Sequence, residues 1–118
     1  MEDTLINILE GFGFPVIRQG SLAPAEAYPE TFFTFWCNSE TEQSAYNNET
    51  VSVVYDFDVN VYSTSPTTVY ELLKAARKTL KQNGWQTPDR GHDVASDEIT
   101  HTGRGMEVTF LNFEPIDE

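Results

Sequence analysis

Basic residues and cysteine are scarce in this sequence of 118 residues. Seven Lys and Arg stand against 19 Asp and Glu, so the formal net charge is −12 at pH 7. Proteins that bind nucleic acid through phosphate contacts, or that attach to anionic membranes, need a basic surface, and neither class is expected here. Cys37 is the single cysteine, which excludes an internal disulfide and favours a reducing compartment.

Long apolar runs and enzyme signatures are also missing. No run approaches the roughly 20 residues of a membrane-spanning helix, and the N-terminus, MEDTLINILEGFGF, is acidic where a secretory signal is basic. The serines lack a GxSxG context, Cys37 lacks a CxxC partner, and Gly11-x-Gly13 is too short for a phosphate-binding loop. The motifs therefore predict no catalytic residue and no cofactor.

Aromatic residues, in contrast, are abundant. Eight Phe, five Tyr and two Trp make up 13% of the chain, which indicates a packed core in place of disorder. The length suits one domain over residues 1–118.

Two segments have a strong hydrophobic period. Residues 51–62 alternate apolar and polar side chains, which predicts a long strand with one buried face. Ser65 is a suitable N-cap and Pro66 suits the first position of a helix that ends at Asn83-Gly84. Its predicted buried stripe is Val69, Leu72, Leu73, Ala76 and Leu80.

Weaker patterns complete the order of elements. A short helix is predicted over residues 1–12, capped by Asp3 or Thr4. Further strands are predicted at 14–18, 31–37, 94–101 and 106–113. The connecting segments are a loop at 19–30, a long acidic loop at 38–50, a tight turn at 102–105 and a frayed tail at 114–118. This order predicts the α+β class, with a mixed or antiparallel sheet of about four to five strands and two helices packed on one face.

Two polar clusters have residue types that can carry chemistry. His92 and His101, with the carboxylates between them, are of kinds that bind a divalent metal, but no HExxH or paired-Cys spacing accompanies them. We favour structural roles and predict no metal. Asp56 and Asp58 share one face of the long strand, where the simpler interpretation is a solvated face and the alternative is an acid–base pair.

The helix predicted after Pro66 holds four of the seven basic residues. An exposed, solvated face is the ordinary interpretation. In a chain this acidic, the same face could dock on the acidic surface of a neighbouring copy. We therefore predict a subunit interface between this helix and the acidic 38–50 segment, formed by Lys74, Arg77, Lys78, Lys81, Glu40, Glu42 and Glu49.

Three stretches together resemble a known family. They are 28–36 (YPETFFTFW), 57–63 (FDVNVYS) and 93–98 (DVASDE) running into 100–105 (THTGRG). The chain resembles small structural proteins from the tail-gene region of Gram-positive siphophages and prophages. Its layout is similar to that of the tail-terminator, or tail-completion, group.

This resemblance implies a non-enzymatic subunit that assembles as a hexameric ring on the tail tube and joins the tail to the head. The implied partners are the tail-tube protein and the head-connector proteins, and the implied location is the virion tail, after assembly in the host bacterial cytoplasm. DNA would pass through the ring without specific binding, and an acidic lumen would repel its phosphates. The alternatives are a neck or head-closure protein, a small metal-dependent hydrolase using His92 and His101, and a regulatory binding module that contacts its partner through residues 19–30.

Overall fold

One long central strand organises the structure. The computed structural model describes residues 1–21, 28–46 and 50–115. Its sheet has the order β1-β2-β3-β5-β4, formed by β1 (Val16–Arg18), β2 (Thr31–Tyr46), β3 (Thr50–Ser63), β4 (His92–Val94) and β5 (Thr102–Pro115). The β1–β2 pair is parallel and the other pairs are antiparallel. The predicted α+β class, with a mixed sheet and two helices, is confirmed.

Helix α2 (Pro66–Gln82) has the predicted start and the predicted buried stripe. The Ser65 hydroxyl accepts a hydrogen bond from the backbone N–H of Thr68 at 3.3 Å, and Pro66 occupies the first turn. All five predicted stripe residues are buried. Helix α1 (Glu2–Glu10) lies within the predicted range 1–12, but the predicted cap is wrong. Met1 is its N-cap, and Asp3 and Thr4 lie inside the helix, where the acidic side chains of the first turn interact favourably with the helix dipole.

The core lies between the two helices and one face of the sheet. Alternate residues of β3 point into it, and the strands on either side add residues at the same register, such as Phe33 opposite Val61 and Val108 opposite Phe57. Leu5 and Leu9 of α1 and the stripe of α2 cover them. The predicted alternation of residues 51–62 is therefore confirmed as one face in the core and one face away from the helices.

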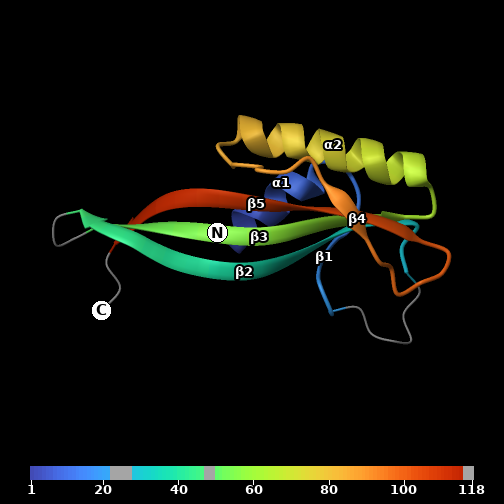
Figure 1. Ribbon diagram of the computed structural model, residues 1–118, viewed down its shortest axis with the longest axis horizontal. Coiled ribbons are helices and arrows are strands. Elements are labelled where there is room, and N and C mark those ends of the chain that lie inside the picture. Colours follow the sequence, from blue (N-terminus) through green and yellow to red (C-terminus); the bar gives the residue numbers. More distant parts are fainter. Residues whose placement is uncertain (22–27, 47–49, 116–118) are drawn as a thin grey trace.

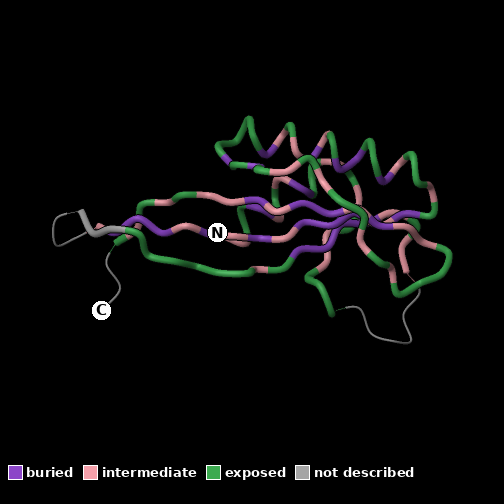
Figure 2. Tube along the Cα trace, in the orientation of Figure 1, coloured by how far each residue is buried: buried purple, intermediate pink, exposed green. Residues whose placement is uncertain are grey.

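The three longest strands continue past both helices (Figure 1). We call this extension, residues 38–46, 50–56 and 109–115, the distal ribbon. It gives the molecule its length, with principal extents of 52 × 29 × 22 Å. Its central strand is the most buried of the three, and β2 along its border is exposed (Figure 2).

The predicted acidic loop over 38–50 is wrong for residues 38–46, which belong to β2. Polar side chains do not prevent pairing, because β3 supplies a complete partner backbone, and register shifts at Cys37/Ser39 and Glu42/Ser44 absorb the irregularities. Residues 47–49 lie outside the described chain. The predicted frayed tail is wrong for Glu114 and Pro115, which pair with β3, and residues 116–118 lie outside the described chain.

Two further predictions near the C-terminus are wrong. The strand predicted at 94–101 ends at Val94, and the turn predicted at 102–105 is the start of β5. The glycines there do not form a turn. They allow side chains of neighbouring strands to pack closely against the backbone. A Cβ on Gly103 would lie 2.6 Å from the ring of Tyr62 and 2.8 Å from Cγ2 of Val94, so glycine lets these side chains lie over the strand.

We predict that Gly103→Ala destabilises the fold by about 1–3 kcal/mol, the usual cost of overpacking. The added methyl group must displace Tyr62 and Val94. Urea unfolding of the variant measures this loss. Thr109→Ala, on the same strand and the same sheet face, removes atoms and is the control, and an equal loss in both variants would contradict the packing explanation.

Candidate functional site

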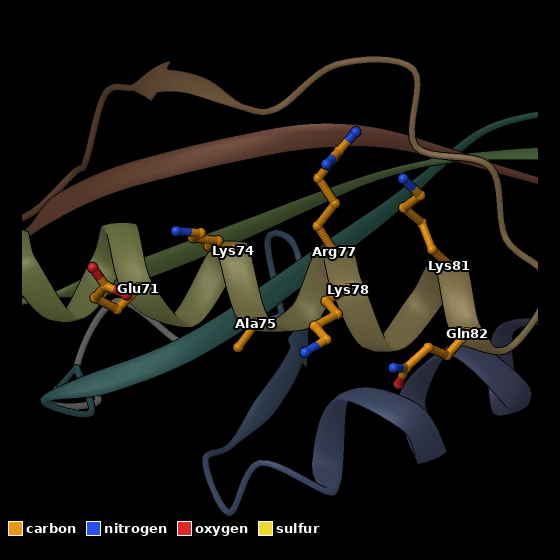
Figure 3. Close-up of a pocket in the computed structure, with 7 residues that line it drawn as sticks. All are labelled: Glu71, Lys74, Ala75, Arg77, Lys78, Lys81 and Gln82. Carbon is orange, nitrogen blue, oxygen red and sulfur yellow. The ribbon is translucent and has the colours of Figure 1, made fainter.

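The outward side of α2 carries the predicted basic residues. Lys74, Lys78 and Lys81 are exposed, and Arg77 is half-buried. They border an open hollow of about 610 Å³ along the helix, together with Glu71, Ala75 and Gln82. Figure 3 shows Arg77 and Lys81 pointing toward the segment that follows the helix, and Lys78 pointing the opposite way. The cations thus cover the two flanks of α2.

Two arginines attach the segment after α2 to the rest of the fold. Arg77 donates to the carbonyl oxygens of Asp89 at 3.1 Å and Thr87 at 3.2 Å. Arg104 of β5 donates to the carbonyl oxygen of Gly91 at 3.0 Å and to the exposed Asp93 carboxylate at 3.3 Å. Because carbonyl oxygens carry no formal charge, these contacts do not neutralise Arg77, whereas Arg104 is paired with Asp93. The positions of both arginines are fixed.

These arginines line a second hollow, which we call the cationic niche. It has a volume of about 290 Å³ and is lined by Tyr70, Lys74, Arg77, Arg90 and Arg104. The Arg104 guanidinium lies 5.4 Å from the centre of the Tyr70 ring, within the range of a cation–π contact. Six of the seven basic residues therefore lie on α2 or line this niche, and the seventh, Arg18, pairs with Glu2 at 2.6 Å.

Acidic side chains gather on the sheet face that the helices leave open. Asp58 lies directly opposite Glu107, and Asp56 lies two residues along β3 on the same face. The nearby Asp56 charge, then burial and the Asp58 charge, raise the pKa of Glu107. None of the ion pairs in the described part of the chain involves these three carboxylates. The structure places Asp56 and Asp58 on the open face, as the simpler interpretation expects.

The acidic members of the predicted interface lie elsewhere. Glu40 and Glu42 are exposed on β2 in the distal ribbon, and Glu49 lies outside the described residues. The ribbon extends away from α2 (Figure 1), so the basic and acidic members do not meet within one copy. Nearby, Tyr55 donates a hydrogen bond to Glu114, which raises the pKa of Tyr55 to about 12 and lowers that of Glu114.

The two histidines are not brought together. His92 is exposed on β4. The ring of His101 donates from Nε2 to the carbonyl oxygen of Pro29 at 2.8 Å and packs edge-on against Tyr28 and Phe32. Within the part of the chain that the structure describes, no three His, Cys, Asp or Glu side chains are grouped to hold a metal ion.

The distal ribbon has two open borders. The sequence analysis predicted part of the strands that form them, but not the borders themselves. Strand β1 pairs with β2 only as far as Phe35, and on the other side a bridge from Gln86 reaches β5 at Thr109. Beyond these points, no described strand pairs with the outer edges of β2 and β5. Residues 39–42 alternate hydroxyl and carboxylate side chains, a period-two signal that hydropathy does not record.

Comparison with known proteins gives no identification: no protein-family model and no curated protein matches the chain. Among the described helices, none has the length and apolar character needed to cross a membrane. The candidate surfaces therefore rest on the geometry alone.

We predict that Glu107→Gln stabilises the protein at pH 7 by about 0.2–1 kcal/mol, the range of cross-strand pairs. Because its pKa is raised in the folded state, Glu107 favours folding when protonated and opposes it as pH rises through that pKa. The gain should therefore vanish at acidic pH and shrink in high salt. Urea unfolding across pH measures it, with Glu42→Gln as the control. A gain that does not depend on pH would contradict charge repulsion as the cause.

Proposed function

We propose that this protein is a non-enzymatic assembly subunit of a phage or prophage tail, which forms a ring at the end of the tail tube and joins the tail to the head. The observation that carries the proposal is the distal ribbon with its two open borders. Open strand edges promote pairing with another chain, and proteins usually shorten, cover or pair them. Here no described strand covers either border over many residues, which favours a partner strand from a second copy.

The direction of the peptide groups supports pairing at the β2 border. Phe33 donates to Pro15 and Phe35 accepts from Gln19, so the peptide groups of Phe33 and Phe35 point away from β3. Phe35 is opposite Val59, and Glu40 and Glu42 are opposite Tyr55 and Val53, which have the same parity on β3. Since these groups alternate along an antiparallel strand, those of Glu40 and Glu42 also point outward. They are available to a neighbouring strand.

The two borders lie on opposite sides of the ribbon, and this determines the kind of assembly. If β2 of one copy pairs with β5 of the next, different patches meet at each contact. Such a heterologous contact closes into a ring when the rotation that relates neighbouring copies is a whole-number fraction of a full turn. The three-stranded ribbons would then form one continuous sheet around the ring. No edge would remain open, as in other closed sheets.

The charge distribution agrees with head-to-tail contact. Cations are concentrated on α2 and in the cationic niche, while Glu40 and Glu42 are exposed on β2, the strand at the opposite border. Copies that meet through opposite sides bring unlike charges closer, which steers association and sets the register. The predicted interface of Lys74, Arg77, Lys78 and Lys81 with Glu40, Glu42 and Glu49 stays part of this proposal.

The resemblance to tail-terminator proteins supplies the biological setting of the proposal. In that setting the ring is a hexamer in the virion tail, and its partners are the tail-tube and head-connector proteins. A net charge of −12 suits a channel through which DNA passes without being held. The carboxylates without ion-pair partners on the open sheet face would keep such a channel acidic.

We predict that Glu40→Pro weakens ring formation relative to Glu40→Ala. Both variants remove the charge, but only proline removes the outward N–H donor, at a cost of about 1 kcal/mol for each subunit contact. Proline at an edge position leaves the β2–β3 ladder intact, so the far-UV circular dichroism should match in the two variants. Sedimentation velocity over a range of concentrations, with negative-stain microscopy, measures the rings.

Two results would contradict the proposal. One is an unchanged monomer at every concentration together with normal tails in particles that lack the protein. The other is equal assembly of the proline and alanine variants. If the protein acts as proposed, particles without it should show tails of uncontrolled length or tails detached from heads.

A further inference from the structure

The segment between β4 and β5 contains a hydrogen-bonded turn. The Ser96 hydroxyl accepts a hydrogen bond from the N–H of Glu98 at 3.2 Å, and the N–H of His101 donates to the carbonyl of Glu98 at 3.0 Å, which closes a turn. His101 is itself held by its contacts with Pro29 and the aromatic rings beside it. The turn therefore presents residues 98–100, which we call the tip, in one arrangement.

The tip has an unusual composition for a solvent-facing turn. Ile99 is fully exposed, the most exposed of the large hydrophobic side chains that the structure describes. Glu98 precedes it and is also exposed. None of the ion pairs in the described residues includes Glu98. An exposed isoleucine beside a carboxylate would suit a partner that offers apolar surface and positive charge together.

The cationic niche offers that combination. Tyr70 is 52% exposed and supplies an aromatic surface, and the stems of Lys74 and Arg90 add aliphatic surface. Four cationic side chains line the niche, and Asp93 is the carboxylate paired with one of them, at Arg104. The niche thus keeps excess positive charge in a chain whose net charge is −12. Its volume of about 290 Å³ can receive one aliphatic side chain and a carboxylate.

The tip and the niche lie on opposite sides of the molecule. The segment that carries the tip rests against β1, β2 and β3, where Ala95 and Ser96 line a small cavity with Ile17 and Tyr62. The niche lies between α2 and the start of β5. In Figure 1 the 95–101 segment descends on the β1 and β2 side, and α2 lies beyond β5. One copy therefore cannot insert its own tip into its own niche.

We propose that the tip of one copy docks in the cationic niche of the next copy, with Ile99 against Tyr70 and Glu98 beside Arg90. The contact runs from the β2 side of one copy to the β5 side of its neighbour, in the same sense as the proposed strand pairing. It rests on the proposed head-to-tail assembly but uses a different surface, so the two contacts can fail separately.

Disulfide crosslinking between two variants tests this contact. Ile99→Cys is mixed with Tyr70→Cys, each in a Cys37→Ser background and each with a different mass tag. The matched control replaces Tyr70→Cys with Glu71→Cys, an exposed neighbour on α2 outside the niche. Cysteines held in contact have a high effective concentration, so the Tyr70 pair should crosslink about tenfold more than the control pair.

A charge exchange tests the electrostatic part. Adding Glu98→Arg to the Ile99→Cys chain should remove the preference for Tyr70→Cys, and adding Arg90→Glu to the partner chain should restore it. Restoration by the exchanged pair shows that both variants remain folded.

Three results separate the possibilities. Rings without preferential crosslinking would overturn the tip contact and leave the strand pairing in place. Preferential crosslinking without rings would support the tip contact and contradict the ring. If no pair is preferred, and Arg90→Glu abolishes binding of a single-stranded DNA oligonucleotide to the otherwise unchanged protein, the niche is a nucleic-acid site and the proposal is wrong.

Discussion

The structure depends on the pairing of β3 with a strand on each side over its whole length. Thr50–Ser63 is hydrogen-bonded to β2 and to β5, so the most apolar strand of the chain has no open edge. This constraint puts alternate residues of three strands on one face, which the helices then cover. It also brings polar segments into the sheet, because the backbone N–H and C=O groups of β3 can pair with any segment that adopts an extended conformation. The distal ribbon follows directly from it.

Separation of charge is the second organising feature. The chain holds few cations, yet six of the seven occupy α2 and the cationic niche, and the carboxylates take the open sheet face and the outer strands. Two of the arginines serve the fold as well, since they attach the segment after α2 through backbone carbonyls. Charges of unlike sign on separate surfaces favour some orientations of two approaching copies over others, which is why the proposed assembly is head-to-tail.

The candidate surfaces were partly predictable. The helical period after Ser65 was enough to place Lys74 and Lys81 on the outward side of α2, because burial of the apolar stripe determines where the remaining residues point. Arg90 and Arg104 could not be assigned to the same surface, since they come from a loop and a strand far along the chain. His92 and His101 are not brought together in the described chain, because His101 is held against Pro29 and Phe32.

By itself, the sequence determined the elements whose signal is local: the α2 cap and stripe, the alternation of β3, and the α+β class that follows from their order. The tertiary structure alone decided that residues 38–46 and 102–105 are strands. Their side chains carry turn-like or polar signals, and only the neighbouring backbone of β3 makes the extended form favourable. Non-local hydrogen bonds of this kind leave no hydrophobic periodicity in the segment that receives them, so the distal ribbon and its open borders become visible only in the folded chain.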